Sequence, residues 1–69
     1  MNTTEEVVKR VLIPKGFFES HGMFIAHNVR PKWLKEGLDT FMADIQVEPH
    51  EDMENYEYVV YKWKFYGDE

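Results

Sequence analysis

The stretch Tyr56 to Tyr66, YEYVVYKWKFY, alternates large side chains, and this alternation constrains the fold more than any other part of the chain. Successive side chains of a β-strand point to opposite faces, and apolar residues at every second position indicate a strand with one buried face. One face carries Val59, Tyr61, Trp63 and Phe65, and the other carries Tyr58, Val60, Lys62, Lys64 and Tyr66. The first face is apolar enough to form a core, so the sequence predicts a strand whose second face is half exposed.

The length of 69 residues predicts one small domain, spanning residues 1–69. A chain of this size buries only about 60% of the surface that it exposes when unfolded, and its core supplies roughly 3–5 kcal/mol. Because the chain has no cysteine, neither a disulfide nor a thiolate zinc site can reinforce it. We therefore consider a homodimer possible.

The N-terminal sequence MNTTEEVVKR lacks the long apolar stretch of a signal peptide or a membrane span. Hydrophobic residues make up 43% of the chain and aromatic residues 16%, well above the range of disordered proteins. These features predict a folded, cytoplasmic protein with no membrane partner.

The segment RPKWLKEGLDTFMADI carries apolar residues at helical spacing, namely Leu34, Leu38, Phe41, Met42 and Ile45. Pro31 suits the first position of a helix, where its missing N–H group would have no intrahelical partner. The pattern predicts a helix from Pro31 to Ile45, with Gly37 in its interior.

Two further segments complete the predicted fold. In GFFESHGMFIAHNV, residues 20–22 can form a turn between two short strands, so this stretch predicts a hairpin. Residues 4–13 fit either a capped helix or a strand, and their β-branched residues favour the strand. The sequence thus predicts an α+β domain of order β-β-β-α-β, with a single helix packed on a small antiparallel sheet.

The charges are distributed unevenly along the chain. Residues 1–35 contain six Lys or Arg and three Asp or Glu, for a net charge of +3, whereas residues 36–61 contain eight Asp or Glu and no Lys or Arg. The last eight residues are neutral, so the net charge of -5 arises from the middle block. Such a field attracts cations and basic protein surfaces and repels nucleic acid.

Neither a catalytic site nor a bound metal is expected. The three histidines, His21, His27 and His50, lack the spacing of a metal-binding pair, and only His50 has acidic neighbours. Ser20 and His21 are adjacent in a predicted turn, where they would not face each other as nucleophile and base. A flexible acidic loop does not raise the pKa of a carboxyl group as acid–base catalysis requires. The sequence predicts a protein that is not an enzyme and needs no cofactor.

Two binding hypotheses remain, together with the hypothesis of a structural or assembly subunit joined through a sheet edge. Tyr58, Lys62, Lys64 and Tyr66 resemble in type the face on which single-stranded nucleic acids stack. Two lysines beside eight carboxylates would neutralise few phosphates, however, which disfavours direct nucleic-acid binding.

The second hypothesis makes the carboxylates the binding surface. Acidic side chains spread over a helix end, a loop and a strand can present charges at roughly the separation of backbone phosphates, about 1.7 Å per charge along a duplex axis. Exposed Tyr and Met side chains would add the apolar contacts that charge alone does not provide. The predicted partner-binding residues are Asp44, Glu48, Glu51, Asp52, Glu54, Glu57, Tyr56 and Tyr58, with Glu36 and Asp39 as second choices.

A small, cysteine-free, acidic and aromatic-rich chain with an acidic block at residues 36–61 resembles the small phage-encoded proteins that take over host functions. This class includes DNA mimics that block nucleoid proteins or nucleases. The resemblance implies a non-enzymatic inhibitor, often dimeric, whose partner is a basic DNA-binding protein of the host cytoplasm. It extends over less than half of the chain and implies no role for any single residue.

Overall fold

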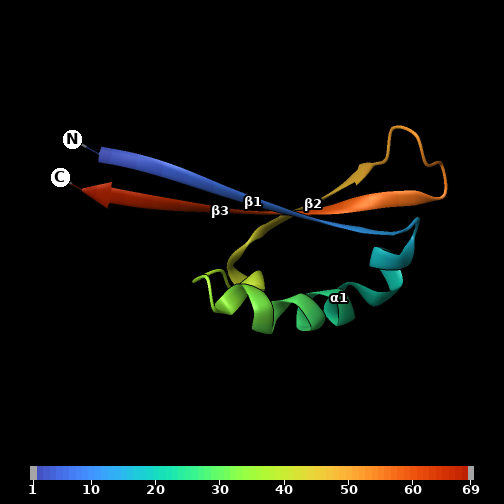
Figure 1. Ribbon diagram of the computed structural model, residues 1–69, viewed down its shortest axis with the longest axis horizontal. Helices are drawn as coiled ribbons and strands as arrows, with labels where there is room; N and C mark the ends of the chain where they lie inside the picture. Colours follow the sequence, from blue (N-terminus) through green and yellow to red (C-terminus); the bar gives the residue numbers. More distant parts are fainter. Residues whose placement is uncertain (1, 69) are drawn as a thin grey trace.

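The computed structural model describes residues 2–68, which form one helix and one antiparallel sheet (Figure 1). The elements in chain order are β1 (Asn2–Pro14), α1 (Phe17–Leu34), the 3-10 turn η1 (Thr40–Met42), β2 (Asp44–Pro49) and β3 (Tyr56–Asp68). The sheet has three strands in the spatial order β1-β3-β2, and α1 covers one of its faces. The predicted α+β class is confirmed, but the element order is β-α-β-β.

The central strand β3 divides its side chains between two faces, although Val60, on the face predicted to be half exposed, is fully buried. Val59, Tyr61 and Trp63 are at most 4% exposed and form the core with residues of α1 and β1. The indole of Trp33 on α1 meets the rings of Tyr61 and Trp63 edge to face, at centroid distances of 5.2 and 5.7 Å. Aromatic pairs favour this geometry, so these three rings anchor the helix to the sheet. Phe65 remains 43% exposed.

The strand interpretation of residues 4–13 is confirmed. β1 pairs with β3 over its whole length, from Asn2 opposite Asp68 to Pro14 opposite Tyr56. Alternate residues of a strand share a face, and Val11 and Ile13 pack into the helix-covered core. The β-branched side chains fit the pleated surface of this long ladder better than a helix.

The predicted hairpin over residues 17–26 is wrong, because this stretch forms the first half of α1. The buried residues Ile25, Ala26 and Trp33 and the half-buried Val29 recur at helical spacing. Gly22 was expected to form part of a turn, but it lies within the helix, where its lack of a side chain matters for packing. A Cβ atom placed there would lie 3.2 Å from the ring of Phe18, so the glycine gives that ring room against the helix.

The predicted helix over Pro31–Ile45 is wrong at both ends, because α1 begins at Phe17, with Pro31 inside it, and ends at Leu34. Gly37 adopts a φ of 82°, and the backbone N–H groups of Gly37 and Leu38 donate to the carbonyls of Leu34 and Trp33, each at 3.0 Å. This pair of hydrogen bonds defines a Schellman motif, in which a glycine in the left-handed conformation ends the helix. Gly37 therefore terminates α1 instead of lying inside it, and the chain turns back through η1 into β2.

An ion pair connects the end of α1 to η1. Arg30 Nε donates to Asp39 Oδ1 at 3.1 Å, and the same carboxylate oxygen accepts the backbone N–H of Phe41 at 3.0 Å. The hydrogen bond from Arg30, together with the one from Phe41, lowers the pKa of Asp39. Asp39 in its charged form thus holds the turn that redirects the chain toward the sheet.

We expect the Asp39→Asn variant to melt at a lower temperature than the wild type at neutral pH, with a difference that shrinks in acid. A carboxyl group whose pKa is depressed by folding stabilises the protein above its unfolded pKa, about 3.9, and this contribution disappears as the pH falls through the folded pKa. Melting curves between neutral pH and pH 2 would measure the difference, with Glu19→Gln as a control. A difference in melting temperature that stays constant over this pH range would contradict the role given to the charged form of Asp39.

β1 and β3 extend beyond the rest of the molecule as a two-stranded arm. The pairing of β2 with β3 ends at Asp44 opposite Lys62, so residues 63–68 of β3 pair only with β1. Figure 1 shows both strands running together past the end of the helix toward the two termini. The exposure of Phe65 follows, because this residue lies on the arm.

Candidate acidic binding surface

The loop between β2 and β3, residues 50–55, is held in shape by His50. Its Nδ1 atom accepts the backbone N–H groups of Asp52 and Met53 at 3.1 and 3.0 Å, and its ring stacks on Tyr58 at a centroid distance of 5.1 Å. Asn55 ties the other end of the loop to the turn before α1, because its carbonyl accepts the N–H of Lys15 at 2.9 Å. The loop is therefore an ordered support for its carboxylates, in contrast to the flexible loop that the sequence suggested.

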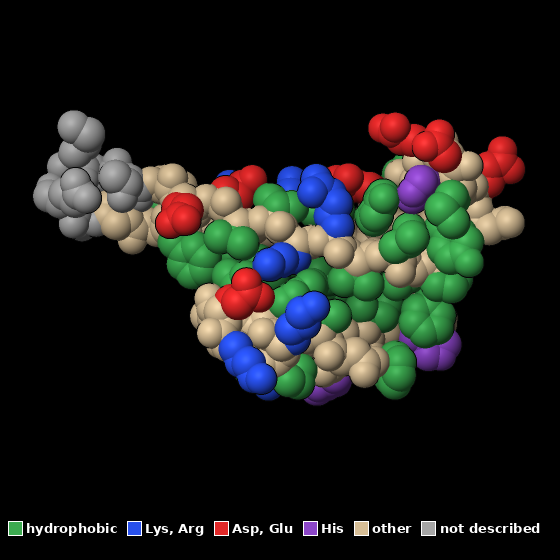
Figure 2. Space-filling view, in the orientation of Figure 1, with side chains coloured by type: hydrophobic (Ala, Val, Ile, Leu, Met, Phe, Trp, Pro, Cys, Tyr) green, Lys and Arg blue, Asp and Glu red, His purple; other side chains and the backbone are tan. Residues whose placement is uncertain are grey.

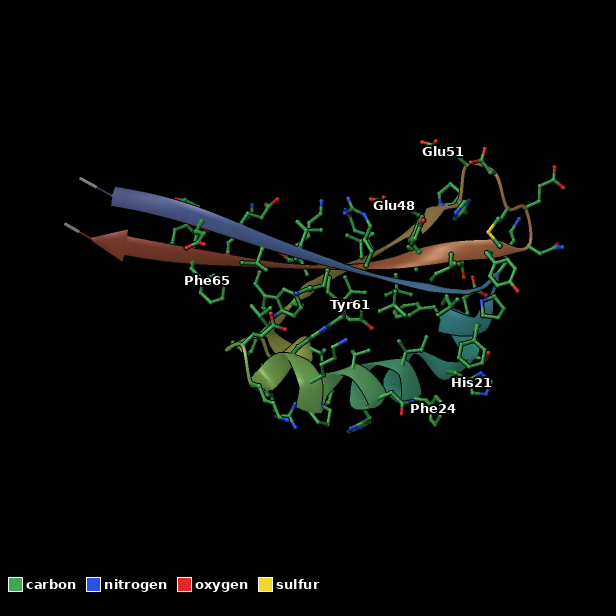
Figure 3. All side chains as sticks on the ribbon, in the orientation of Figure 1. His21, Phe24, Glu48, Glu51, Tyr61 and Phe65 are labelled. Carbon is green, nitrogen blue, oxygen red and sulfur yellow. The ribbon has the colours of Figure 1, made fainter. Side chains whose placement is uncertain are left out.

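Five of the predicted acidic residues lie along one end and one edge of the sheet. Glu51, Asp52 and Glu54 are exposed on the loop, and Asp44 and Glu48 lie on the face of β2 opposite the helix. Figure 3 shows Glu48 and Glu51 both directed away from α1, and Figure 2 shows acidic side chains clustered over the loop. No Lys or Arg among residues 2–68 is within ion-pair distance of any of the five. We call these residues, Asp44, Glu48, Glu51, Asp52 and Glu54, the acidic surface.

The other predicted acidic residues have partners within the fold. Glu57 lies on the helix-covered side of β3, and its Oε1 accepts the backbone N–H of Gly16 at 2.8 Å, at the start of α1. A carboxylate at the N-terminus of a helix is favoured by the helix dipole. Glu36 pairs with Lys9 at 3.3 Å and Asp39 with Arg30. These three residues thus have partners within the fold, and the Glu36–Lys9 pair is the more exposed of the two ion pairs.

The sheet face opposite α1, the open face, changes from acidic to mixed charge across its width. The register aligns Glu48 with Tyr58 and Leu12, Gln46 with Val60 and Arg10, and Asp44 with Lys62 and Val8. A shallow hollow at the loop end of this face is lined by Arg10, Glu48, Pro49, His50, Glu51, Asp52 and Tyr58. Arg10 precedes the other residues of this hollow by more than thirty positions in the sequence and was not predicted to lie there.

The aromatic and lysine residues share the open face, as predicted, but they are dispersed. Tyr66 is 78% exposed on the arm, whereas Tyr58 is half-buried with its ring stacked on His50. Tyr58 and Tyr66 are eight positions apart on β3, which corresponds to about 26 Å along a strand. Tyr56 is 38% exposed beside the loop. The rings of Tyr58 and Tyr66 therefore do not form one continuous stacking platform.

The remaining histidines have apolar neighbours. His21 stacks on Phe17 at 4.5 Å, and His27 meets Phe41 edge to face at 5.4 Å. Ser20 Oγ lies 2.8 Å from His21 Nδ1, so the expectation that these two side chains do not face each other is wrong. Both are exposed at a kink where His21 leaves helical geometry. Within residues 2–68 no three His, Asp or Glu side chains are grouped as metal ligands would be.

The comparisons with known proteins give no relative. No family model, no curated protein and no solved structure matches the chain. Among the described residues, no helix is both long enough and apolar enough to span a membrane.

We expect the His50→Ala variant to keep its fold but to lose the shape of the loop. The substitution leaves the N–H groups of Asp52 and Met53 without their acceptor, and a net hydrogen bond contributes about 0.5–1.5 kcal/mol. Hydrogen exchange followed by NMR should show roughly tenfold faster exchange at these two amides, while the amides of β3 are unchanged. His27→Ala serves as the control, and equal exchange in both variants would contradict the role of His50.

Proposed function

We propose that the chain is a non-enzymatic, protein-binding inhibitor that acts in the cytoplasm. Its acidic surface occupies the basic nucleic-acid-binding site of another protein, such as a nucleoid protein or a nuclease. The observation that carries the proposal is the group of carboxylates on the loop and β2, none of which forms an ion pair with a Lys or Arg of residues 2–68, although Lys62 lies opposite Asp44 and Arg10 borders the hollow. An ordered surface with an excess of acidic side chains attracts basic partners and speeds their association.

The spacing of the carboxylates supports a resemblance to DNA. Residues two apart on a strand are about 6.6 Å apart, because each residue adds about 3.3 Å. Each strand of a DNA duplex carries one phosphate per 3.4 Å of helix axis, so charges on alternate strand positions match every second phosphate. Asp44 and Glu48 lie four residues apart on β2, about 13 Å, with Gln46 at the position between them, so these two charges match about every fourth phosphate. A groove that binds a phosphate backbone would therefore meet charges at compatible intervals.

Apolar side chains beside the carboxylates can supply contact area. Met53 and Tyr56 are 39% and 38% exposed next to the loop carboxylates. Aromatic and Met side chains are enriched in the buried centres of protein interfaces, whereas exposed charge pairs contribute little affinity. The surface thus combines charge, which steers the partner, with apolar contacts, which retain it.

A competition experiment tests this proposal. The protein is added to labelled duplex and single-stranded DNA, both bare and loaded with a basic nucleoid protein, and complexes are resolved by gel shift. The proposal requires that bare DNA stays free and that loaded DNA is released. A shift of bare DNA would support the alternative, binding through Lys62, Lys64 and Tyr66, and the Lys62→Glu, Lys64→Glu double variant would then abolish the shift.

A further inference from the structure

The outer edge of β1 is a long, uncovered row of backbone hydrogen-bonding groups. β1 has 13 residues and pairs only with β3 within the described part of the chain. An unpaired strand edge is a template for pairing with another strand, and proteins usually protect it with charges, bulges or a covering element. Among the described residues, the only backbone–backbone hydrogen bond outside the sheet near this strand follows its last residue, from the N–H of Lys15 to the carbonyl of Asn55, and the side chain of Lys9 donates to Glu36 on the helix-covered side.

The charges on this edge are complementary to themselves in the antiparallel direction. The sequence EEVVKR places Glu5 and Glu6 before two valines, and Lys9 and Arg10 after them. Reversing the direction of the strand exchanges the acidic and basic ends. A second copy of β1 laid antiparallel to the first, with Val8 at the centre, would therefore place Glu6 of each copy opposite Arg10 of the other.

We propose that this edge binds a second copy of the chain, so that two sheets join through β1 into one six-stranded sheet. Antiparallel pairing of identical strands requires a twofold axis normal to the sheet, which keeps both helices on the same face. Val8 lies at the midpoint of Asn2–Pro14, so placing it on the axis pairs the whole strand. In this register Glu6 lies opposite Arg10 of the second copy, and Thr4 lies opposite Leu12 of the second copy.

The two residues that carry opposite charges in this register, Glu6 and Arg10, belong to the open face. Glu6, Val8 and Arg10 share this face with Lys62 and Lys64 of β3. Glu6 and Arg10 are exposed, and neither belongs to an ion pair within residues 2–68. Opposite charges facing each other across strands stabilise the pairing, and the twofold axis makes the pair twice.

The two-stranded arm gives an independent reason for this partner. An isolated pair of strands is at best marginally stable in water, and three or more strands with a covered face are needed. The arm contains the first residues of β1 and residues 63–68 of β3, with Phe65 43% exposed. In the dimer its β1 half would lie beside residues 10–14 of the second copy, and the arm would become part of a sheet of at least three strands.

The opposite edge of the sheet disfavours such pairing. β2 reads DIQVEP, and antiparallel self-pairing about Gln46 would place Asp44 opposite Glu48 of the second copy. Like charges directly opposite each other destabilise a strand pair. β1 is thus the edge that attracts a second copy, while β2 remains free for the acidic surface.

A charge exchange tests the proposal. Sedimentation velocity should show wild-type protein at twice the chain mass of 8.3 kDa, dissociating on dilution. Glu6→Arg or Arg10→Glu alone places like charges opposite each other and should raise the dimer dissociation constant at least about tenfold. The double variant, Glu6→Arg with Arg10→Glu, should restore it. A monomeric wild type, or a dimer indifferent to both single changes, would overturn the proposal.

A cysteine cross-link tests the register without altering charge. The chain has no cysteine, so Val8→Cys introduces a single thiol on the proposed axis. Directly opposed residues of antiparallel strands have Cα atoms about 4.5–5.5 Å apart, within the range that a disulfide bridges. Oxidation should yield covalent dimers from Val8→Cys but not from Val47→Cys on β2. The reverse result would place the contact on the other edge, and no dimer from Val8→Cys would exclude this register.

Discussion

The Trp63→Ala variant is expected to be largely unfolded at room temperature. Trp63 is 4% exposed at the centre of β3, and its indole packs against Trp33 and Tyr61. Its Nε1 atom donates a hydrogen bond of 2.7 Å to the carbonyl of Asp39, at the start of η1. One side chain thus links the sheet, the helix and the returning chain.

The expected decrease in the free energy of unfolding is comparable to the whole stability of the domain. Truncation of a buried Phe or Trp to Ala costs about 3–5 kcal/mol, and a single core in a chain of this size supplies roughly 3–5 kcal/mol. The lost hydrogen bond adds to the deficit, because the carbonyl of Asp39 loses its donor. Folded and unfolded molecules of the variant would then be present in similar amounts, or the unfolded ones would predominate.

Urea titration followed by far-ultraviolet circular dichroism measures this effect. Tyr61→Phe provides a control in the same core, because the hydroxyl of Tyr61 is buried with no hydrogen-bond partner in the described chain. Removing an unsatisfied polar group without changing the ring should leave the stability equal or higher. A Trp63→Ala variant as stable as the wild type would show that the core does not depend on this ring.

Reversal of two loop charges, Glu51→Lys with Asp52→Lys, is expected to weaken binding to a basic partner by about 100-fold, or about 2.7 kcal/mol. Both side chains are exposed on the loop, and the backbone contacts that order it come from His50, so the fold should be unaffected. The salt dependence of binding should also become shallower, because fewer attractive charges remain to be screened.

A matched control separates a local contact from the effect of net charge. Glu19→Lys with Glu36→Lys changes the net charge by the same amount on the helical side of the molecule. Glu36 gives up only an exposed ion pair with Lys9, which contributes little to stability. Equal loss of affinity in the two double variants would show that binding follows net charge and has no preference for the acidic surface.

Part of the acidic surface could be predicted from the sequence. Runs of acidic residues without intervening cations are visible in the sequence, and Asp44, Glu48, Glu51, Asp52 and Glu54 do lie on exposed or open-face positions of one end of the sheet. Glu57 cannot be separated from them by sequence, because its hydrogen bond to Gly16 spans 41 residues. The ordering of the loop by His50 was missed although its hydrogen bonds reach only two and three residues along the chain, because a histidine in an acidic stretch more often indicates an exposed loop.

Features that depend on side-chain alternation along a strand could be predicted from the residues alone. The periodicity of two in β3 and the β-branched residues of β1 are local properties, so the strands and the core face could be predicted. Tertiary structure decided where the helix begins and ends. Apolar spacing continued past Gly37, but the left-handed glycine and the pairing of residues 44–49 with β3 ended α1 and made Ile45 part of the sheet. Long-range strand pairing outweighs local helical spacing because it buries apolar surface and satisfies a whole row of backbone groups.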